Sequence, residues 1–140
     1  MSSEHLEAIR RLKARYFRCI DTKDWAGLRD VVCDDIDIDV HADSGRRYAG
    51  GDAFVASVQR NLADAVSVHH GHMPEIEMTS STTAMGVWSM EDEIWFPEGA
   101  SIRYLHGYGH YHETYRREPD GQWRIATMRL VRLRRDVQEW

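Results

Sequence analysis

The chain of 140 residues carries 18 lysines and arginines against 23 aspartates and glutamates, which gives a formal net charge of −5 at pH 7. This acidic balance argues against a nucleic-acid-binding protein, which needs a basic excess on one face. With 42% hydrophobic residues and only 3 prolines, the chain has enough apolar surface to offset its conformational entropy, so disorder is excluded as the main state. The length predicts one domain, residues 1–140, with room for a small pocket.

The N-terminal segment and the cysteines favour a cytoplasmic protein. A charged amphipathic stretch follows Met1 without an apolar signal core, and no apolar run approaches the roughly 18 residues of a membrane span. Cys19 and Cys33 both fall in segments patterned as helices, where buried, reduced thiols are expected. We therefore expect neither a membrane nor a nucleic acid as a partner.

Helical patterns fill most of the first half of the chain. Apolar residues spaced three and four apart, without Gly or Pro, predict a helix over residues 4–20. A second helical pattern covers residues 24–32, with Asp24 or Thr22 available as its cap. Apolar residues over 54–62 indicate a third helix.

Strand patterns begin with residues 35–40, which alternate between aspartate and a β-branched residue, as in a strand with one wet and one buried face. A short strand is expected around Arg47 and Tyr48. Four long segments rich in β-branched and aromatic residues follow, separated by turn signals: 66–79, 82–96, 101–117 and 122–135. Helices first and an antiparallel meander afterwards predict an α+β fold, in which a helical layer on a curved sheet can leave a cone-shaped cavity.

Chemistry in this chain must come from acids, bases and phenols. The sequence has no glycine-rich phosphate loop, no Cys-x-x-Cys and no Gly-x-Ser-x-Gly. Six of the 8 histidines fall within residues 69–72 and 106–112, and histidine exchanges protons near neutral pH. Alternate residues from Tyr104 to His112 share one sheet face, which can line a polar pocket or form a subunit contact. The spacing of His110 and His112 also occurs in some zinc sites.

Three stretches of the chain resemble a known family: residues 6–21 with Tyr-Phe-Arg-Cys-x-Asp, residues 67–77 with His-x-Gly-His-x-Pro-Glu-Ile, and residues 82–92. Together they resemble the SnoaL-like branch of the NTF2-like superfamily over nearly the whole chain. Within it the bile acid 7α-dehydratases are most similar, and the scytalone dehydratases and lindane dehydrochlorinases are more distant.

The resemblance implies a cone-shaped α+β barrel, with N-terminal helices packed on a curved, mostly antiparallel sheet that encloses a deep pocket. It implies elimination of water or halide by a histidine and an aspartate, with no cofactor and no metal. A homo-oligomer is also implied, with a trimer favoured over a dimer.

The resemblance assigns the site to particular positions of this chain. The tyrosine and aspartate of the first block correspond to Tyr16 and Asp21, and the histidine of the second block corresponds to His69. The acid after the Trp-containing strand corresponds to Asp92, and an arginine of the last strand corresponds to Arg132.

The match to the scytalone dehydratases is mixed. His106 corresponds to their second catalytic histidine, whereas the tyrosines that position the leaving water correspond to Ile20 and Val40. Trp88 and Met90 share strand parity with the acid at position 92, which makes them candidates for the wall of a substrate pocket.

The residue types agree with a proton-transfer site. His69 can act as a general base when a carboxylate such as Asp21 holds its ring, and the Tyr16 phenol can donate to a developing enolate oxygen. Arg132 shares parity with apolar Ala126, Met128 and Leu130, so it needs a buried or interfacial partner, for which Asp92 is a candidate. Each residue also has a structural alternative. Tyr16 can be a core tyrosine, Asp21 a helix-end cap and His69 a hydrogen-bonded strand histidine. Arg132 can form an ion pair between subunits.

We therefore expect a cofactor-independent dehydratase-type lyase that acts on a hydrophobic, polycyclic or steroid-like carbonyl compound. A ketosteroid-type isomerase uses the same base and is an alternative. A non-catalytic small-molecule-binding or assembly subunit is a further alternative, because fold does not fix function. The lyase hypothesis requires the imidazole of His69 and the carboxylate of Asp21 to meet at a cavity.

Overall fold

The computed structural model describes residues 2–40 and 45–140. Their helices and strands follow each other in the order α1 (Ser2–Asp21), α2 (Trp25–Asp30), β1 (Val32–Val40), β2 (Arg46–Ala49), α4 (Gly51–Leu62), β3 (Val66–Met78), β4 (Thr83–Trp95), β5 (Tyr104–Arg117) and β6 (Trp123–Gln138). The expected α+β order is confirmed, with helices concentrated before residue 63 and a long meander after it.

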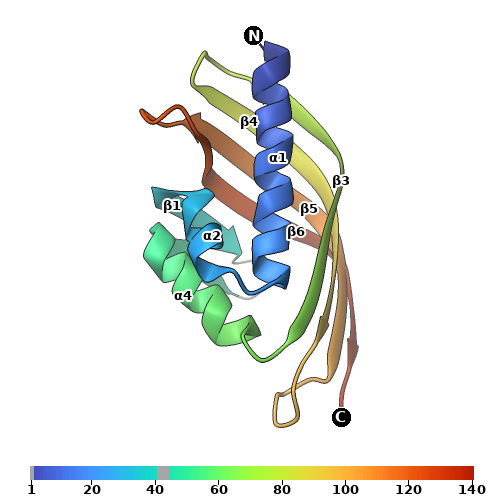
Figure 1. The fold of residues 1–140 in the computed structure, drawn as a ribbon. Coiled ribbons are helices and arrows are strands. Elements are labelled where there is room, and N and C mark those ends of the chain that lie inside the picture. Colours follow the sequence, from blue (N-terminus) through green and yellow to red (C-terminus); the bar gives the residue numbers. More distant parts are fainter. Residues whose placement is uncertain (1, 41–44) are drawn as a thin grey trace.

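The strands form one six-stranded sheet in the order β2-β1-β6-β5-β4-β3. Neighbouring strands are antiparallel except β1 and β6, which are parallel. The sheet curves around α1, and the helices drawn in Figure 1 all lie on its concave side. The sheet is not closed, because β2 and β3 are its two edges. The expected barrel is therefore an open half-cone.

The apolar stripe of α1 fixes its position on the sheet. Leu12, Tyr16 and Ile20 are spaced four apart, and all three are buried in the main core. The helix ends in a hydrogen-bonded turn in which the N–H of Asp24 donates to the carbonyl of Cys19 at 2.8 Å. Asp21, the last residue of α1, therefore lies where the buried stripe meets the sheet. Within the described residues, no helix has the length and apolarity to cross a membrane.

The second helix is shorter than the sequence pattern indicates. Asp24 caps α2 by accepting a hydrogen bond from the N–H of Gly27 at 2.9 Å, as expected. The helix ends at Asp30, so the prediction that Cys33 lies in a helix is wrong: Cys33 belongs to β1. Its thiol is nevertheless free and buried, and burial raises its pKa to about 12. The other cysteine, Cys19, is also free and buried.

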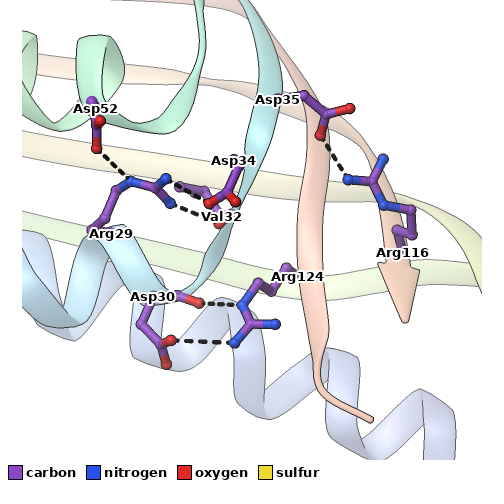
Figure 2. Close-up of polar contacts among 8 residues, drawn as sticks. All are labelled: Arg29, Asp30, Val32, Asp34, Asp35, Asp52, Arg116 and Arg124. Atoms are coloured by element: carbon purple, nitrogen blue, oxygen red, sulfur yellow. Dashed lines mark hydrogen bonds and ion pairs between the residues drawn. The ribbon is translucent and has the colours of Figure 1, made fainter. Parts of the chain in front are cut away.

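Ion pairs connect α2, β1, α4 and β6 on the outer surface (Figure 2). Arg29 of α2 donates to Asp34 of β1 at 2.6 Å and to Asp52 of α4 at 2.8 Å. Arg124 of β6 donates to the backbone carbonyl and the carboxylate of Asp30 at 2.8 and 3.2 Å. Single exposed pairs contribute at most about 1 kcal/mol each, but together they connect α2 and α4 with β1 and β6.

Two irregularities set which residues of β6 face inward. The pairing with β5 shifts twice, and Ala126 and Leu133 have no partner residue on β5. Because of the shift at Ala126, the prediction that Ala126 and Met128 lie on the same face of the strand is wrong. Met128 and Leu130 are buried on the concave face, and Arg132 lines the same cavity as both of them.

Candidate active site

A cavity of about 220 Å³ lies between the helices and the concave face of the sheet. It is lined by Tyr16, Ile20, Ile38, Val40, Arg46, Tyr48, Phe54, Ser57, Val58, Asn61, Leu62, His69, Asp92, Ile94, Tyr111, Met128, Leu130 and Arg132. Half of these residues are aliphatic residues, methionine or phenylalanine, and the other half bring polar groups to the same space, a combination that suits a small-molecule site.

A larger hollow of about 520 Å³ lies elsewhere, beside Arg29 and Arg124. Both arginines are already paired with carboxylates there (Figure 2). The residues that line this hollow are mostly charged, whereas the smaller cavity combines apolar walls with converging polar groups, so we assign the candidate site to the smaller cavity.

Asp21 and His69 form a hydrogen-bonded pair at the end of α1. Nδ1 of His69 lies 2.7 Å from Oδ1 of Asp21. The backbone N–H of His69 donates to Oδ2 of Asp21 at 2.8 Å, and the hydroxyl of Ser67 donates to Oδ1 at 3.0 Å. Because β3 is an edge strand, N–H groups on its free side lack a strand partner, and the carboxylate at the helix end satisfies one of them. These contacts fix both the carboxylate and the imidazole that it orients.

Asp92 faces His69 across β3 and β4, where the two residues are direct cross-strand partners. Its carboxylate makes a bidentate ion pair with Arg132, with both N···O distances at 2.9 Å. The expected pairing of Arg132 with Asp92 is confirmed. Oδ2 of Asp92 lies 3.8 Å from Nε2 of His69. The ring nitrogen that Asp21 does not hold is therefore turned toward Asp92 and the cavity.

Gly107 makes room for this ion pair. It is the cross-strand partner of Asp92 on β5. A Cβ atom at this position would lie 2.5 Å from Oδ1 of Asp92 and would also collide with Nη1 of Arg132. The absence of a side chain at Gly107 therefore allows the guanidinium to cross β5 and reach the carboxylate.

Replacing Gly107 with alanine is expected to push Arg132 away from Asp92. A displacement of about 1 Å in a positioned group can cost about 10²-fold in rate, so we expect a loss of that order in kcat/KM. The control is His110→Ala on the outward side of the same strand, which should leave kcat/KM unchanged. A fully active Gly107→Ala variant would show that the Asp92–Arg132 pair is not needed.

Two buried phenols form the floor of the cavity. The hydroxyl of Tyr16 lies 3.5 Å from the sulfur of Met128, and the Tyr16 and Tyr111 rings meet edge to face at 6.2 Å. Burial, reinforced by the charge of Glu113, raises the pKa of Tyr16 far above its usual value. Burial likewise raises the pKa of Tyr111. Both phenols therefore stay protonated and can act as hydrogen-bond donors.

A buried ion pair, which the sequence analysis did not predict, lies beneath these phenols. Nζ of Lys13 lies 2.7 Å from Oε2 of Glu113, and both side chains are fully inaccessible to solvent. The ammonium also lies 3.9 Å from the Tyr16 ring centroid and 3.7 Å from that of Tyr111. Burial lowers the pKa of Lys13 to about 8, although Glu113 opposes this effect. Lys13 lies within the apolar stripe of α1, which is the sequence signal that could have revealed it.

His106 does not lie at the cavity, contrary to the role expected for it. On β5 the inward positions carry buried residues such as Leu105 and Tyr111, so the row from Tyr104 to His112 faces the opposite side of the sheet. There Nε2 of His106 lies 2.9 Å from Oε2 of Glu91. The row therefore does not line this cavity, and a polar pocket or a subunit contact on the other face of the sheet stays a prediction.

Trp88 and Met90 face the concave side, as their parity with Asp92 predicts, but neither lines the cavity. Both belong to the main core, where the indole N–H of Trp88 donates to the hydroxyl of Tyr115 at 2.8 Å. Ile20 and Val40 do line the cavity, so the wall is apolar where the scytalone dehydratase pattern expects tyrosines. Within residues 2–40 and 45–140, no His, Cys, Asp or Glu cluster has an arrangement suited to a metal ion.

This arrangement can transfer a proton inside a small apolar cavity. It combines an imidazole held in place by a carboxylate, a second ring nitrogen that faces the cavity and Asp92, protonated phenols, and a carboxylate whose charge is balanced by a guanidinium. An oriented imidazole is suited to general base chemistry, and a buried phenol to stabilising a developing oxyanion.

Solved structures resemble the chain over nearly its whole length. Kfla4162 of Kribbella flavida is 20% identical, with a TM-score of 0.88, covering 97% of this chain and 95% of that one. A Novosphingobium aromaticivorans protein with a provisional scytalone dehydratase assignment is 18% identical, with a TM-score of 0.87, covering 99% and 91%. The hexachlorocyclohexane dehydrochlorinase LinA-type3 of Novosphingobium barchaimii is 17% identical, with a TM-score of 0.81, covering 97% and 91%. At these identities, the likeness establishes the fold.

A family model places the chain more firmly than the structural likenesses do. The model described as a SnoaL-like domain matches residues 1–129. The matched range includes the segments that contain Asp21 and His69 and ends within β6. The protein belongs to the SnoaL-like domain family of the NTF2-like superfamily.

Proposed function

We propose that the protein is a cofactor-independent carbon–oxygen lyase that removes water from an apolar ring compound bearing a carbonyl group. The observation that carries this proposal is the 2.7 Å contact between Nδ1 of His69 and Oδ1 of Asp21, with Nε2 of the same ring turned toward the cavity. Dehydratase-type and dehydrochlorinase-type names among the structural neighbours support an elimination rather than another use of the same base.

The proton transfer starts at His69. Asp21 accepts the Nδ1–H, so Nε2 carries the free electron pair and can take a proton from the carbon next to the substrate carbonyl. The C–H electron pair forms a double bond to the carbonyl carbon, and the π pair of the carbonyl moves onto its oxygen, which gives an enolate. Asp21 then stabilises the imidazolium that forms, as Asp92 does from 3.8 Å on the other side.

The enolate oxygen needs a hydrogen-bond donor in a site with little water. Tyr16 lines the cavity, and burial keeps its phenol protonated. Its O–H donates to the developing charge, which is worth most in a desolvated site. Tyr111, which lines the same floor, supports Tyr16.

Loss of the β-hydroxyl completes the reaction. As the carbon–oxygen bond breaks, the enolate electrons form the carbon–carbon double bond. The leaving hydroxyl takes the proton back from the imidazolium of His69. Water and a conjugated carbonyl compound are the products, and His69 returns to its starting state.

The enclosed volume limits the size of the substrate. Pockets that bury a whole drug-sized ligand measure about 300–1,000 Å³, whereas this cavity measures about 220 Å³. We therefore propose that the cavity encloses the reacting ring, and that any further rings of a polycyclic or steroid-like substrate extend beyond it.

The test is product analysis with β-hydroxy ketones of one, two and four rings, labelled with deuterium at the α carbon. We expect formation of the conjugated ketone with loss of the label, and His69→Gln should lower the rate by about 10²–10⁴-fold. The matched control is His70→Gln, because His70 is the exposed neighbour on the same strand.

The alternatives give different results in the same experiment. Migration of a double bond in an unsaturated ketone without loss of water would identify an isomerase. Saturable binding without turnover, unchanged in His69→Gln, would favour a binding subunit. Either result would contradict the lyase proposal.

A further inference from the structure

The cavity has a second polar end, far from His69 in the sheet order. His69 lies on β3, one edge of the sheet, whereas Arg46 and Tyr48 lie on β2, the opposite edge. Arg46 and Tyr48 alternate along β2, and both line the cavity. The curvature of the sheet thus brings both edges to one chamber, and apolar residues such as Val58 and Leu130 line the rest of it.

The guanidinium of Arg46 is available to a ligand, whereas that of Arg132 is not. Arg132 is already held by both oxygens of Asp92. Arg46 is exposed at the start of β2, and no carboxylate of the described residues forms an ion pair with it. An exposed guanidinium that also lines the cavity stands at its mouth.

Tyr48 anchors this end. Burial favours the neutral phenol, yet hydrogen bonds with Ser57 and Arg46, together with the charges of Arg46 and Arg60, outweigh burial and lower the pKa of Tyr48. Tyr48 and Arg46 therefore form a local positive field with a phenol O–H beside it, in a protein whose net charge is −5. This arrangement is suited to a negatively charged group.

We infer that the substrate carries a carboxylate that Arg46 and Tyr48 hold at the mouth of the cavity, while its reacting ring lies toward His69. A planar guanidinium matches a carboxylate with two parallel hydrogen bonds, and a nearby phenol can add another. The orientation of the ligand rests on the proposed function, but recognition of the carboxylate does not.

Arg47 provides a matched control for the charge. It lies next to Arg46 but on the opposite face of β2, where it makes a bidentate contact with Asp37 at 3.1 and 2.6 Å. Replacing either arginine with glutamine removes one positive charge from the same short strand. Only Arg46 lines the cavity.

The test is calorimetric titration with 2-naphthoate and with 2-naphthamide, which has the same ring system and a neutral amide. We expect the native protein to bind the carboxylate at least about tenfold more tightly, as for charge-assisted hydrogen bonds. Arg46→Gln should remove this preference, Arg46→Lys should keep part of it, and Arg47→Gln should keep it fully. His69→Gln should also keep the preference, which separates recognition from catalysis.

Three results would overturn the inference: equal affinity of the native protein for the two probes, an equal loss in Arg47→Gln, or no saturable binding of the carboxylate. Comparing the two probes on the native protein needs no variant, so a misfolded Arg46→Gln protein would not leave the question open.

Discussion

Replacing Asp21 with asparagine is expected to lower kcat/KM for the proposed elimination by about 10²–10⁴-fold while the fold is retained. The carboxylate accepts hydrogen bonds at both oxygens: Oδ2 from the backbone N–H of His69 at 2.8 Å, and Oδ1 from the Ser67 hydroxyl at 3.0 Å. It also holds Nδ1 of His69 at 2.7 Å. An amide has only one acceptor oxygen, so its NH₂ group must face one of these donors.

Either orientation of the asparagine amide is expected to disturb the contact with His69. If the NH₂ group faces Nδ1, the ring must carry its proton on Nε2, which then cannot act as a base. If it faces the backbone N–H of His69, two donors oppose each other and the end of α1 moves away from β3. The measurement is a steady-state rate together with a thermal unfolding curve for each variant.

Two controls sharpen the experiment. Asp24→Asn lies three residues away and keeps a side chain that caps α2, so its activity should equal that of the native protein. Ser67→Ala removes only one of the contacts to Asp21, so a smaller loss is expected. Full activity of Asp21→Asn would exclude a dyad in which Asp21 sets the tautomer of His69.

The contact between Asp21 and His69 and the ion pair between Asp92 and Arg132 could be anticipated from the sequence because local rules place their residues. Helical periodicity puts Asp21 at the end of a buried stripe, and strand parity puts Asp92 and Arg132 on apolar faces. The resemblance then indicated which histidine joins them. That His69 and Asp92 are direct cross-strand partners depends on the register of β3 and β4, which no local pattern fixes.

The wrong predictions also concern features that depend on strand register and on packing between distant elements. Parity shows that His106 and Tyr108 share a face, but either face of β5 carries aromatic residues, so parity cannot show which one is inward. Each extra residue in β6 reverses which alternate residues face inward beyond it. A glycine often marks such a bulge, but the two extra residues are Ala126 and Leu133, so the sequence gives no sign of them. Cavity walls depend on packing between distant elements, which is why Trp88 lies in the core beside the site rather than at its wall.

The buried pair of Lys13 and Glu113 shows most clearly what local patterns miss. Each residue lies on an apolar face of its own element, which marks it as unusual but does not name its partner 100 residues away. Only packing α1 onto the sheet brings the two together. Since a buried charge is tolerated only when paired, each residue explains the position of the other.

Replacing Lys13 with methionine is expected to lower the free energy of unfolding by about 3–5 kcal/mol, because Glu113 is left as a buried charge without its partner. Both side chains are fully inaccessible, so water cannot replace the lost contact without opening the core. Protonation can neutralise an unpaired carboxylate, so the loss should be smaller in mild acid than near neutral pH. Denaturant unfolding at both conditions measures the difference.

The double variant Lys13→Met with Glu113→Gln separates charge from packing. Glutamine keeps an oxygen to accept the hydrogen bond that Tyr115 donates to Glu113 at 2.8 Å, but it brings no charge into the core. We expect the double variant to be more stable than Lys13→Met alone, because the desolvated charge is gone. Arg11→Met, on the exposed side of α1, should change the free energy of unfolding by no more than about 0.5 kcal/mol. If the double variant were no more stable than the single one, the loss would come from the packing of the lysine stem, and Glu113 would not depend on Lys13 for its place in the core.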